Sequence, residues 1–241
     1  MTTRYLSAGR TVTGKVRKHN EDAILIRDDV GLWVVADGLG GHAAGDYAST
    51  MIVERLGLLP RNGSVFDFIE SIEDTLVKIN ADLLETAVVR GVDLIGSTIV
   101  LLVYDSDLML CGWVGDSRAY RLQDNLLQQI TRDHVHGGDV DVTHFGGAAP
   151  AAAPAAGSGV LTRAVGAEDQ LYVDWVVADN RPGTTFVLCS DGINKEMTDA
   201  ELHAEGCQYP QPQDLTDRLF DLALSRAGRD NISAVVVRLQ E

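Results

Sequence analysis

Basic residues are scarce in this sequence. Lys and Arg together number 20 against 35 Asp and Glu in 241 residues, which gives a formal net charge of −15 at pH 7. A protein with this charge repels phosphate backbones and anionic lipid headgroups. We therefore expect no binding to nucleic acid or to membrane surfaces. An excess of carboxylates is instead compatible with hard divalent cations, which prefer oxygen ligands.

Long apolar runs and paired cysteines are also missing. No segment approaches the roughly 18 apolar residues that span a bilayer, and residues 1–18 lack the apolar core of a signal peptide. The 3 cysteines, Cys111, Cys189 and Cys207, are far apart and outside any CxxC spacing. Two of them lie in apolar runs of strand length, so we expect free thiols in the core and a cytoplasmic protein.

Apolar runs of strand length recur along the chain, beginning with AILIRDD and GLWVVADG and ending with residues 232–239. The second run should end at residues 37–42, because that loop is too rich in glycine to continue a strand. Short polar turns separate the runs STIVLLVY, LMLCGWVG, SRAYRL and LLQQI. Antiparallel pairing is expected there, since a parallel crossover needs a dozen or more residues.

Helical signals interrupt these strands. One helix should follow the glycine-rich loop, at about residues 43–58, and another should cover about residues 214–227. Apolar residues spaced three and four apart predict a helix from about residue 65 to residue 90, with Ser64 as N-cap and Asp67 three residues on. Helix pairs among antiparallel strands predict an α+β fold, a four-layer α-β-β-α sandwich with two mostly antiparallel central sheets.

The segment 137–159 differs in composition from the rest of the chain. Every residue from 146 to 159 is Gly, Ala, Pro or Ser, which is typical of a flexible loop that buries little apolar surface. A loop of this length is either a functional flap or a disordered insertion. Because strand-like runs resume beyond it, we interpret it as a flap-like insertion in a single domain over residues 1–241.

Acidic residues stand next to glycine at several strand ends. Asp37, Asp116 and Asp191 each follow an apolar run directly or within two residues, where a carboxylate emerges at a sheet edge. Carboxylates brought together repel one another unless cations neutralise them, and an oxygen-only site suits Mg²⁺ or Mn²⁺ better than Zn²⁺. An isolated Asp-Gly pair is usually a turn. Spacing alone therefore leaves turns and a metal site as open alternatives.

Several short stretches extend these clusters, and none is specific alone. They are GKVRKHNEDA, VVADGLGGHAAGDYAS, GST, VGDSRAYRL, ITRDH, LTRAVG, LCSDGI and GRDNIS. In wording and order, over nearly the whole chain, they resemble the bacterial metal-dependent protein Ser/Thr phosphatases of the type 2C family. LTRAVGA and GRDN look most like the phosphatases encoded with type VI secretion systems. The resemblance implies hydrolysis of phosphoserine and phosphothreonine on proteins by a metal-bridged hydroxide, opposing a Ser/Thr kinase.

The same resemblance implies a centre of two Mn²⁺ or Mg²⁺ ions. Asp37 would bridge both ions, and the carbonyl of Gly38 would ligate one of them. Asp191 and Asp230 would complete the other ion's ligands. Glu21 would act on the second ion through water.

Further residues would assist this centre. A third, weakly bound ion, which the resemblance leaves open, would use Asp116 together with Asp191. Asp22 would support the metal ligands without contacting an ion itself, and Asn231 would orient Asp230. All of these carboxylates are present in the chain.

Two residues are implied in the reaction itself. Arg17 matches the family's phosphate-binding arginine, whose planar fork can hold two phosphoryl oxygens; the alternative is a solvated arginine beside Lys15 and Lys18. His42 is a candidate general acid for the leaving alkoxide. The acid of animal members directly follows Asp-Gly, where this chain has Leu39, so support of the loop is the second interpretation of His42.

The other histidines carry no catalytic signal. His134, in ITRDH, is expected to be a structural hydrogen-bonding residue. For His19, His136, His144 and His203, which belong to no motif, we expect solvated surface positions.

The resemblance also implies partners. These are phosphorylated protein substrates, together with a forkhead-associated-domain protein and its Ser/Thr kinase, and we expect a monomer. One rival function is a phosphatase-like binding or sensory module, but such a module would have lost metal carboxylates that this chain retains. The other rival, a metal-dependent phosphodiesterase on nucleic acid, conflicts with the charge of −15.

Overall fold

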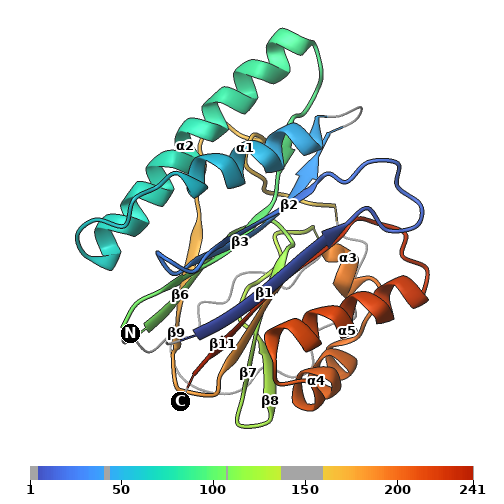
Figure 1. Cartoon of the computed structure of the whole chain (residues 1–241). Coiled ribbons are helices and arrows are strands. Elements are labelled where there is room, and N and C mark those ends of the chain that lie inside the picture. The colour runs from blue at the N-terminus through green and yellow to red at the C-terminus, as the bar shows by residue number, and fades with distance from the viewer. Residues whose placement is uncertain (1–4, 41–43, 107, 137–159, 241) are drawn as a thin grey trace.

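The computed structural model describes residues 5–40, 44–106, 108–136 and 160–240. Two antiparallel sheets pack face to face within these residues, and helices cover the outer face of each sheet (Figure 1). This is the α-β-β-α sandwich expected from the sequence. The insertion at 137–159 lies outside the described residues.

Each sheet combines segments that are distant in the sequence. The first has the order β1 (Tyr5–Val12), β11 (Ile232–Leu239), β10 (Thr185–Cys189), β7 (Arg118–Gln123), β8 (Leu126–Gln129). The second has the order β2 (Asp22–Arg27), β3 (Leu32–Leu39), β5 (Ile99–Tyr104), β6 (Leu108–Val114), β9 (Asp174–Asp179), and the short β4 (Gly96–Ser97) pairs with β3. All of these pairs are antiparallel. The short turns correctly predicted this for β5 with β6 and for β7 with β8. The expected pairing of β6 with β7 is wrong, because the chain passes from one sheet to the other between them.

The central strands are buried on both faces, which explains their continuous apolar runs. In β3, Trp33 and Val35 point into the core between the sheets, whereas Val34 and Ala36 point into the core beneath the helices. Successive strand residues face opposite sides. A single strand thus joins two of the three cores and holds Asp37 at the end of a rigid element.

The helices α1 (Gly45–Gly57) and α2 (Val65–Arg90) cover the second sheet (Figure 1). The predicted N-cap of α2 is confirmed: the Ser64 side chain accepts from the Asp67 nitrogen, and the Asp67 carboxylate accepts from the Ser64 nitrogen over 2.7 Å. Gly91 ends the helix in the left-handed conformation at φ 63°. Among the described helices, none is long and apolar enough to cross a membrane.

The helices α3 (Asp191–Asn194), α4 (Asp199–Gln208) and α5 (Pro212–Ser225) cover the first sheet. The sequence predicts the last of these helices from about residue 214, but Pro212 in the first helical turn begins it earlier. The helix α4 was not predicted. That helix carries a capping box of Thr198 and Glu201, which is the local signal that could have found it.

The expected end of β3 is wrong. The strand continues through Gly38 to Leu39 because β4 supplies partners for both residues, with Gly38 opposite Ser97 and Leu39 opposite Gly96. Asp37 and Gly38 therefore lie within a paired strand and not in a free loop.

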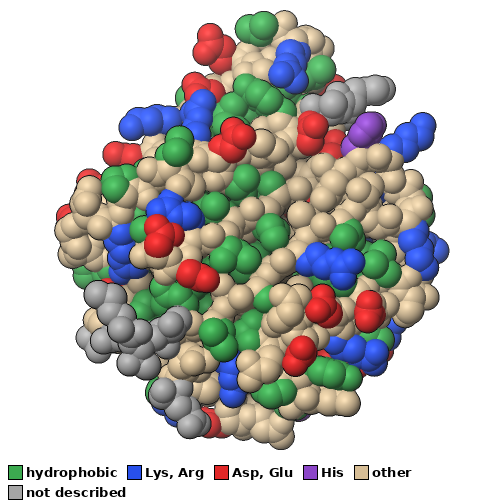
Figure 2. Space-filling view, in the orientation of Figure 1, with side chains coloured by type: hydrophobic (Ala, Val, Ile, Leu, Met, Phe, Trp, Pro, Cys, Tyr) green, Lys and Arg blue, Asp and Glu red, His purple; other side chains and the backbone are tan. Residues whose placement is uncertain are grey.

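Charged side chains are mixed on the face of the molecule shown in Figure 2. Acidic and basic groups alternate there with apolar ones, and no acidic patch dominates that face. The net charge of −15 is thus not concentrated on this side of the protein.

Candidate active site

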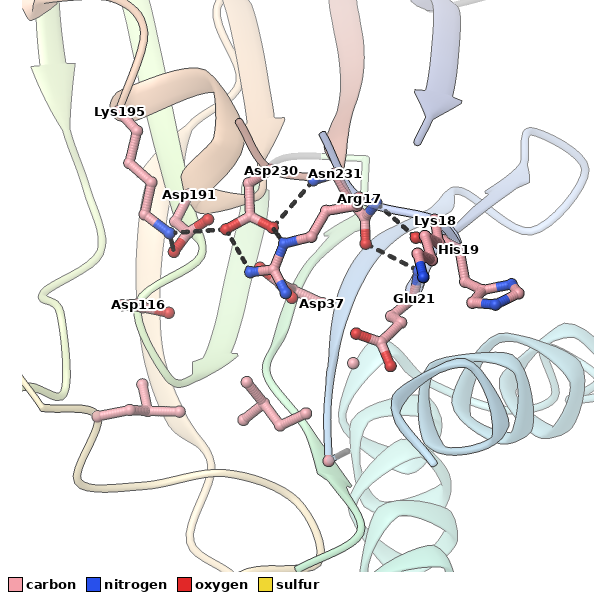
Figure 3. A pocket seen from close by; sticks show the side chains of 14 residues that line it. Arg17, Lys18, His19, Glu21, Asp37, Asp116, Asp191, Lys195, Asp230 and Asn231 are labelled. Atoms are coloured by element: carbon pink, nitrogen blue, oxygen red, sulfur yellow. Dashed lines mark hydrogen bonds and ion pairs between the residues drawn. The ribbon is translucent and has the colours of Figure 1, made fainter. Parts of the chain in front are cut away.

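A cleft of about 830 Å³ lies where loops from both sheets meet. The predicted acidic residues line it together with three cations and several small residues (Figure 3). The lining residues are Arg17, Lys18, His19, Glu21, Asp37, Gly38, Leu39, Gly40, Asp116, Leu161, Asp191, Lys195, Asp230 and Asn231. The fold therefore brings together residues that the sequence separates by more than half of the chain.

Asp37 is fixed from its backbone. Its carbonyl oxygen accepts from the Thr98 nitrogen over 2.8 Å and from the Ser97 hydroxyl over 3.0 Å. Burial raises the pKa of Asp37 well above its ordinary value, and the carboxylates of Asp22 and Asp191 raise it further. A buried carboxylate among like charges is a strong acceptor for a cation.

Gly38 packs too closely against its neighbours to carry a side chain. A Cβ atom there would lie 2.1 Å from the backbone oxygen of Gly45. The Gly38 nitrogen donates to the backbone oxygen of Glu21 over 3.0 Å, and the Ser49 hydroxyl donates to the same oxygen over 2.6 Å. These contacts fix Glu21 beside the Asp37–Gly38 segment.

Asp22 lies directly across the β2–β3 ladder from Asp37. Its Oδ2 atom accepts from the Ser190 hydroxyl over 2.9 Å, whereas its buried Oδ1 atom has no hydrogen-bond partner among the described residues. Burial is the largest cause that raises its pKa, to about 6. A buried, unpartnered carboxylate oxygen costs free energy unless a water or a cation satisfies it.

Asn231 connects the loop before β2 to the loop before β11. Its amide nitrogen donates to the backbone oxygens of Thr13 and His19, both over 2.9 Å. Its amide oxygen accepts from the Glu21 nitrogen over 2.9 Å. The contact with Asp230 comes from its backbone nitrogen, which donates to Asp230 Oδ1 over 3.0 Å.

Two cationic side chains, Arg17 and Lys195, form ion pairs with the cleft carboxylates Asp230 and Asp191 (Figure 3). Arg17 Nε lies 2.8 Å from Asp230 Oδ1, and Lys195 Nζ lies 3.0 Å from Asp230 Oδ2. The ammonium of Lys195 also contacts the carboxylate of Asp191. Partial burial raises the pKa of Asp230, but Lys195 and Arg17 outweigh it and hold the pKa below the ordinary value.

Asp116 lies in the turn between β6 and β7. Burial is the main cause that raises its pKa to about 6, and the charge of Asp191 adds to it. The preceding residue, Gly115, donates from its nitrogen to His134 Nδ1 over 3.0 Å. His134 is thus the structural hydrogen-bonding residue that the sequence predicted.

The solvated position expected for His19 is confirmed, because its side chain is exposed, and the same residue also lines the cleft. The sequence motifs missed one cleft residue, Lys195, although a lysine four residues after Asp191 is the spacing at which helical side chains meet. His42 lies outside the described residues, so both interpretations of it stand.

The donors fit divalent metal ions by their chemistry. The acidic residues that line the cleft offer only oxygen donors, which suit hard divalent ions. A positive charge would also stabilise the buried Asp37 and the unpartnered Oδ1 atom of Asp22 behind it. No three His, Cys, Asp or Glu side chains of the described residues converge closely enough to enclose an ion. Asp191 and Asp230 instead form ion pairs with Lys195 and Arg17.

Comparison with known proteins identifies relatives over almost the whole chain. Residues 14–222 match the family described as Protein phosphatase 2C. The serine/threonine phosphatase stp of Listeria monocytogenes (serotype 4b, strain F2365) is 31% identical, with 95% of this chain and 93% of that protein covered.

Solved structures agree with this match. The structure of PppA, described as a key regulatory component of T6SS in Pseudomonas aeruginosa, is 38% identical with a TM-score of 0.86, and 98% of this chain and 97% of that chain are covered. The catalytic domain of the serine/threonine protein phosphatase PstP, in complex with 2 manganese ions, is 25% identical with a TM-score of 0.82. That comparison covers 98% of this chain and 99% of the other.

Proposed function

Since the chain belongs to the protein phosphatase 2C family and is a protein-serine/threonine phosphatase, we propose that the carboxylates of its cleft form the catalytic metal centre. Asp37, Gly38, Asp191 and Asp230 hold two Mn²⁺ or Mg²⁺ ions in this proposal, and Glu21 acts on one of them through water. The supporting observation is the buried Asp37, whose pKa is raised by burial and by neighbouring carboxylates.

Bound divalent ions lower the pKa of a coordinated water and neutralise phosphoryl oxygens, which is the chemistry that phosphoester hydrolysis needs at neutral pH. The residues of this chain do the positioning. The β3–β4 pairing fixes Asp37 and Gly38, and Asn231 fixes the backbone of Glu21. Asp22 supports Asp37 from the adjacent strand. Asp116 adds a carboxylate at the Asp191 end of the cleft.

We assign the phosphoryl contact to Arg17. Its side chain is half exposed (51%) and points into the cleft over Asp230 (Figure 3). A guanidinium can hold two phosphoryl oxygens in one plane, which a lysine cannot reproduce. In this role Arg17 binds the substrate dianion and orients it toward the carboxylates.

The biological setting is also a proposal. The likeness to PppA, at 38% identity, supports a role in type VI secretion, in which the chain would oppose a Ser/Thr kinase and act on a forkhead-associated-domain protein. We place one monomeric phosphatase domain in the cytoplasm. Free cysteines, Cys111 and Cys189 buried and Cys207 exposed, are compatible with a reducing compartment.

Hydrolysis of p-nitrophenyl phosphate and of a phosphothreonine peptide tests the metal centre. The wild-type protein should be active with Mn²⁺ and inactive with a chelator. Asp37→Asn should lose nearly all activity, whereas Asp93→Asn, which removes an exposed carboxylate, should retain it. Full activity of Asp37→Asn in saturating Mn²⁺ would overturn the assignment.

A further inference from the structure

Lys195 directly follows the short helix α3, whose first residue is Asp191. Its ammonium contacts the carboxylate of Asp191 and lies 3.0 Å from that of Asp230. The two carboxylates come from different elements, because Asp230 lies in the loop before β11. One lysine therefore joins two of the proposed metal ligands.

Asp116 lines the same cleft as Asp191, Asp230 and Lys195 (Figure 3). Lys195 thus supplies fixed positive charge to the end of the cleft formed by Asp116, Asp191 and Asp230, called here the distal end.

An ammonium and a divalent ion need the same carboxylate oxygens. An ion that binds Oδ2 of Asp191 or Asp230 must share that oxygen with Lys195, and the nearby positive charge repels the ion. Lys195 differs in this respect from Lys18, which lines the same cleft but takes part in no salt bridge among the described residues.

We propose that Lys195 is a built-in competitor of divalent ions at the distal end of the cleft. The inference rests on the proposed function, since it takes the carboxylates of the cleft as metal ligands. It has a direct consequence for the number of ions: a third ion at Asp116 and Asp191 is disfavoured, because the ammonium already contacts the Asp191 carboxylate. Lys195 is a positioning residue, and its effect is on metal affinity.

The test compares Mn²⁺ binding to four proteins by titration calorimetry at constant pH and ionic strength. They are the wild type, Lys195→Met, Lys195→Arg and Lys18→Met. Lys195→Met keeps the length of the side chain and removes its charge, whereas Lys195→Arg keeps the charge. Lys18→Met removes a charge from the same cleft without breaking an ion pair. Melting temperatures in a chelator provide a second measurement that needs no metal.

Lys195→Met should bind its weakest Mn²⁺ roughly five-fold or more tightly than the wild type, in the range expected for a partly exposed ion pair to two carboxylates. Lys195→Arg and Lys18→Met should bind like the wild type. In a chelator, Lys195→Met should melt below both other variants, because it leaves Asp191 and Asp230 with less positive charge.

Unchanged Mn²⁺ affinity in Lys195→Met would overturn the inference, and so would equal tightening in Lys195→Arg or Lys18→Met. These outcomes are distinct from failure of the proposed function, in which the wild type binds no Mn²⁺ at all. In that case the melting temperatures would still show whether Lys195 neutralises the carboxylates, but competition with metal ions would be refuted.

Discussion

His134 and Gly115 form a reciprocal pair of hydrogen bonds. The Gly115 nitrogen donates to His134 Nδ1 over 3.0 Å, and the His134 nitrogen donates back to the Gly115 oxygen over 3.0 Å. Because Nδ1 accepts, the neutral ring carries its proton on Nε2, which lies 2.8 Å from Asp174 Oδ2. Burial lowers the pKa of His134 and favours this neutral form. The ring therefore fixes the turn that carries Asp116.

His134→Phe should lower the free energy of unfolding by about 1–3 kcal/mol, the cost of a buried donor left without its acceptor. The replacement keeps an aromatic ring against Trp113, which stacks on His134 with ring centroids 6.2 Å apart. Urea denaturation measures the loss. The control, His136→Phe, alters an exposed side chain two residues away and should change stability by no more than about 0.5 kcal/mol. Equal losses in both variants would refute the role of the Gly115 bond.

Gly38→Ala should abolish phosphatase activity or prevent folding. The added Cβ atom would lie 2.1 Å from the Gly45 backbone oxygen, and neither strand nor helix can yield without moving Asp37. Gly57→Ala is the matched control, because a Cβ atom there meets only Leu25 at an ordinary 3.4 Å. Circular dichroism and p-nitrophenyl phosphate turnover compare the two. A fully active Gly38→Ala protein would contradict the close contact between Gly38 and the Gly45 backbone oxygen.

The metal-free protein should become less stable as pH rises from about 4 to above 6. The pKa values of Asp22 and Asp116 rise from 3.8 to about 6 on folding, so the folded protein binds protons that the unfolded chain releases. The pKa of His134 is lowered on folding, so its own contribution to stability increases with pH, but it is one group against two carboxylates. We expect the free energy of unfolding in a chelator to be about 2 kcal/mol higher at pH 5 than at pH 7.5.

Saturating Mn²⁺ should remove or reverse this trend, because the metal binds the ionised carboxylates of the folded protein. Urea denaturation at both pH values, with chelator and with Mn²⁺, provides the measurement. A stability that rises with pH in the chelator would contradict the shifts in the carboxylates.

Arg17→Ala should raise KM at least ten-fold, since a charge-assisted contact with phosphate contributes roughly 1.5–3 kcal/mol. Arg17→Lys should recover only part of the loss, because an ammonium lacks the planar fork. Steady-state kinetics on a phosphopeptide and on an aryl phosphate measure the effect. Arg121→Ala, on β7 outside the cleft lining, serves as the control. An unchanged KM on both substrates would refute phosphate binding by Arg17 and favour the alternative, a solvated surface arginine.

Features with local causes could be predicted from the sequence. The spacing of apolar residues and the Ser64–Asp67 pair gave the start of α2, and the observed helix begins at Val65. Short polar turns correctly indicated antiparallel strands. In both cases the interactions that decide the structure lie within a few residues of one another.

Features that depend on contacts between distant parts of the chain could not be predicted from the sequence. The continuation of β3 through Gly38 depends on β4, which is distant in the sequence. The link from Asn231 to Glu21 joins residues 210 positions apart, and the contact of Lys195 with Asp230 joins residues 35 positions apart. Sequence motifs indicated the carboxylates that line the cleft, but not the cations that neutralise them.

The pairing of β11 with both β1 and β10 has a consequence for protein synthesis. Asp230 and Asn231 immediately precede β11, so they emerge from the ribosome among the last residues of this fold. Until then Glu21 lacks the amide that holds its backbone, and Arg17 lacks its carboxylate partner. Because domains fold as units, the cleft should not assemble in a nascent chain until β11 has left the ribosome.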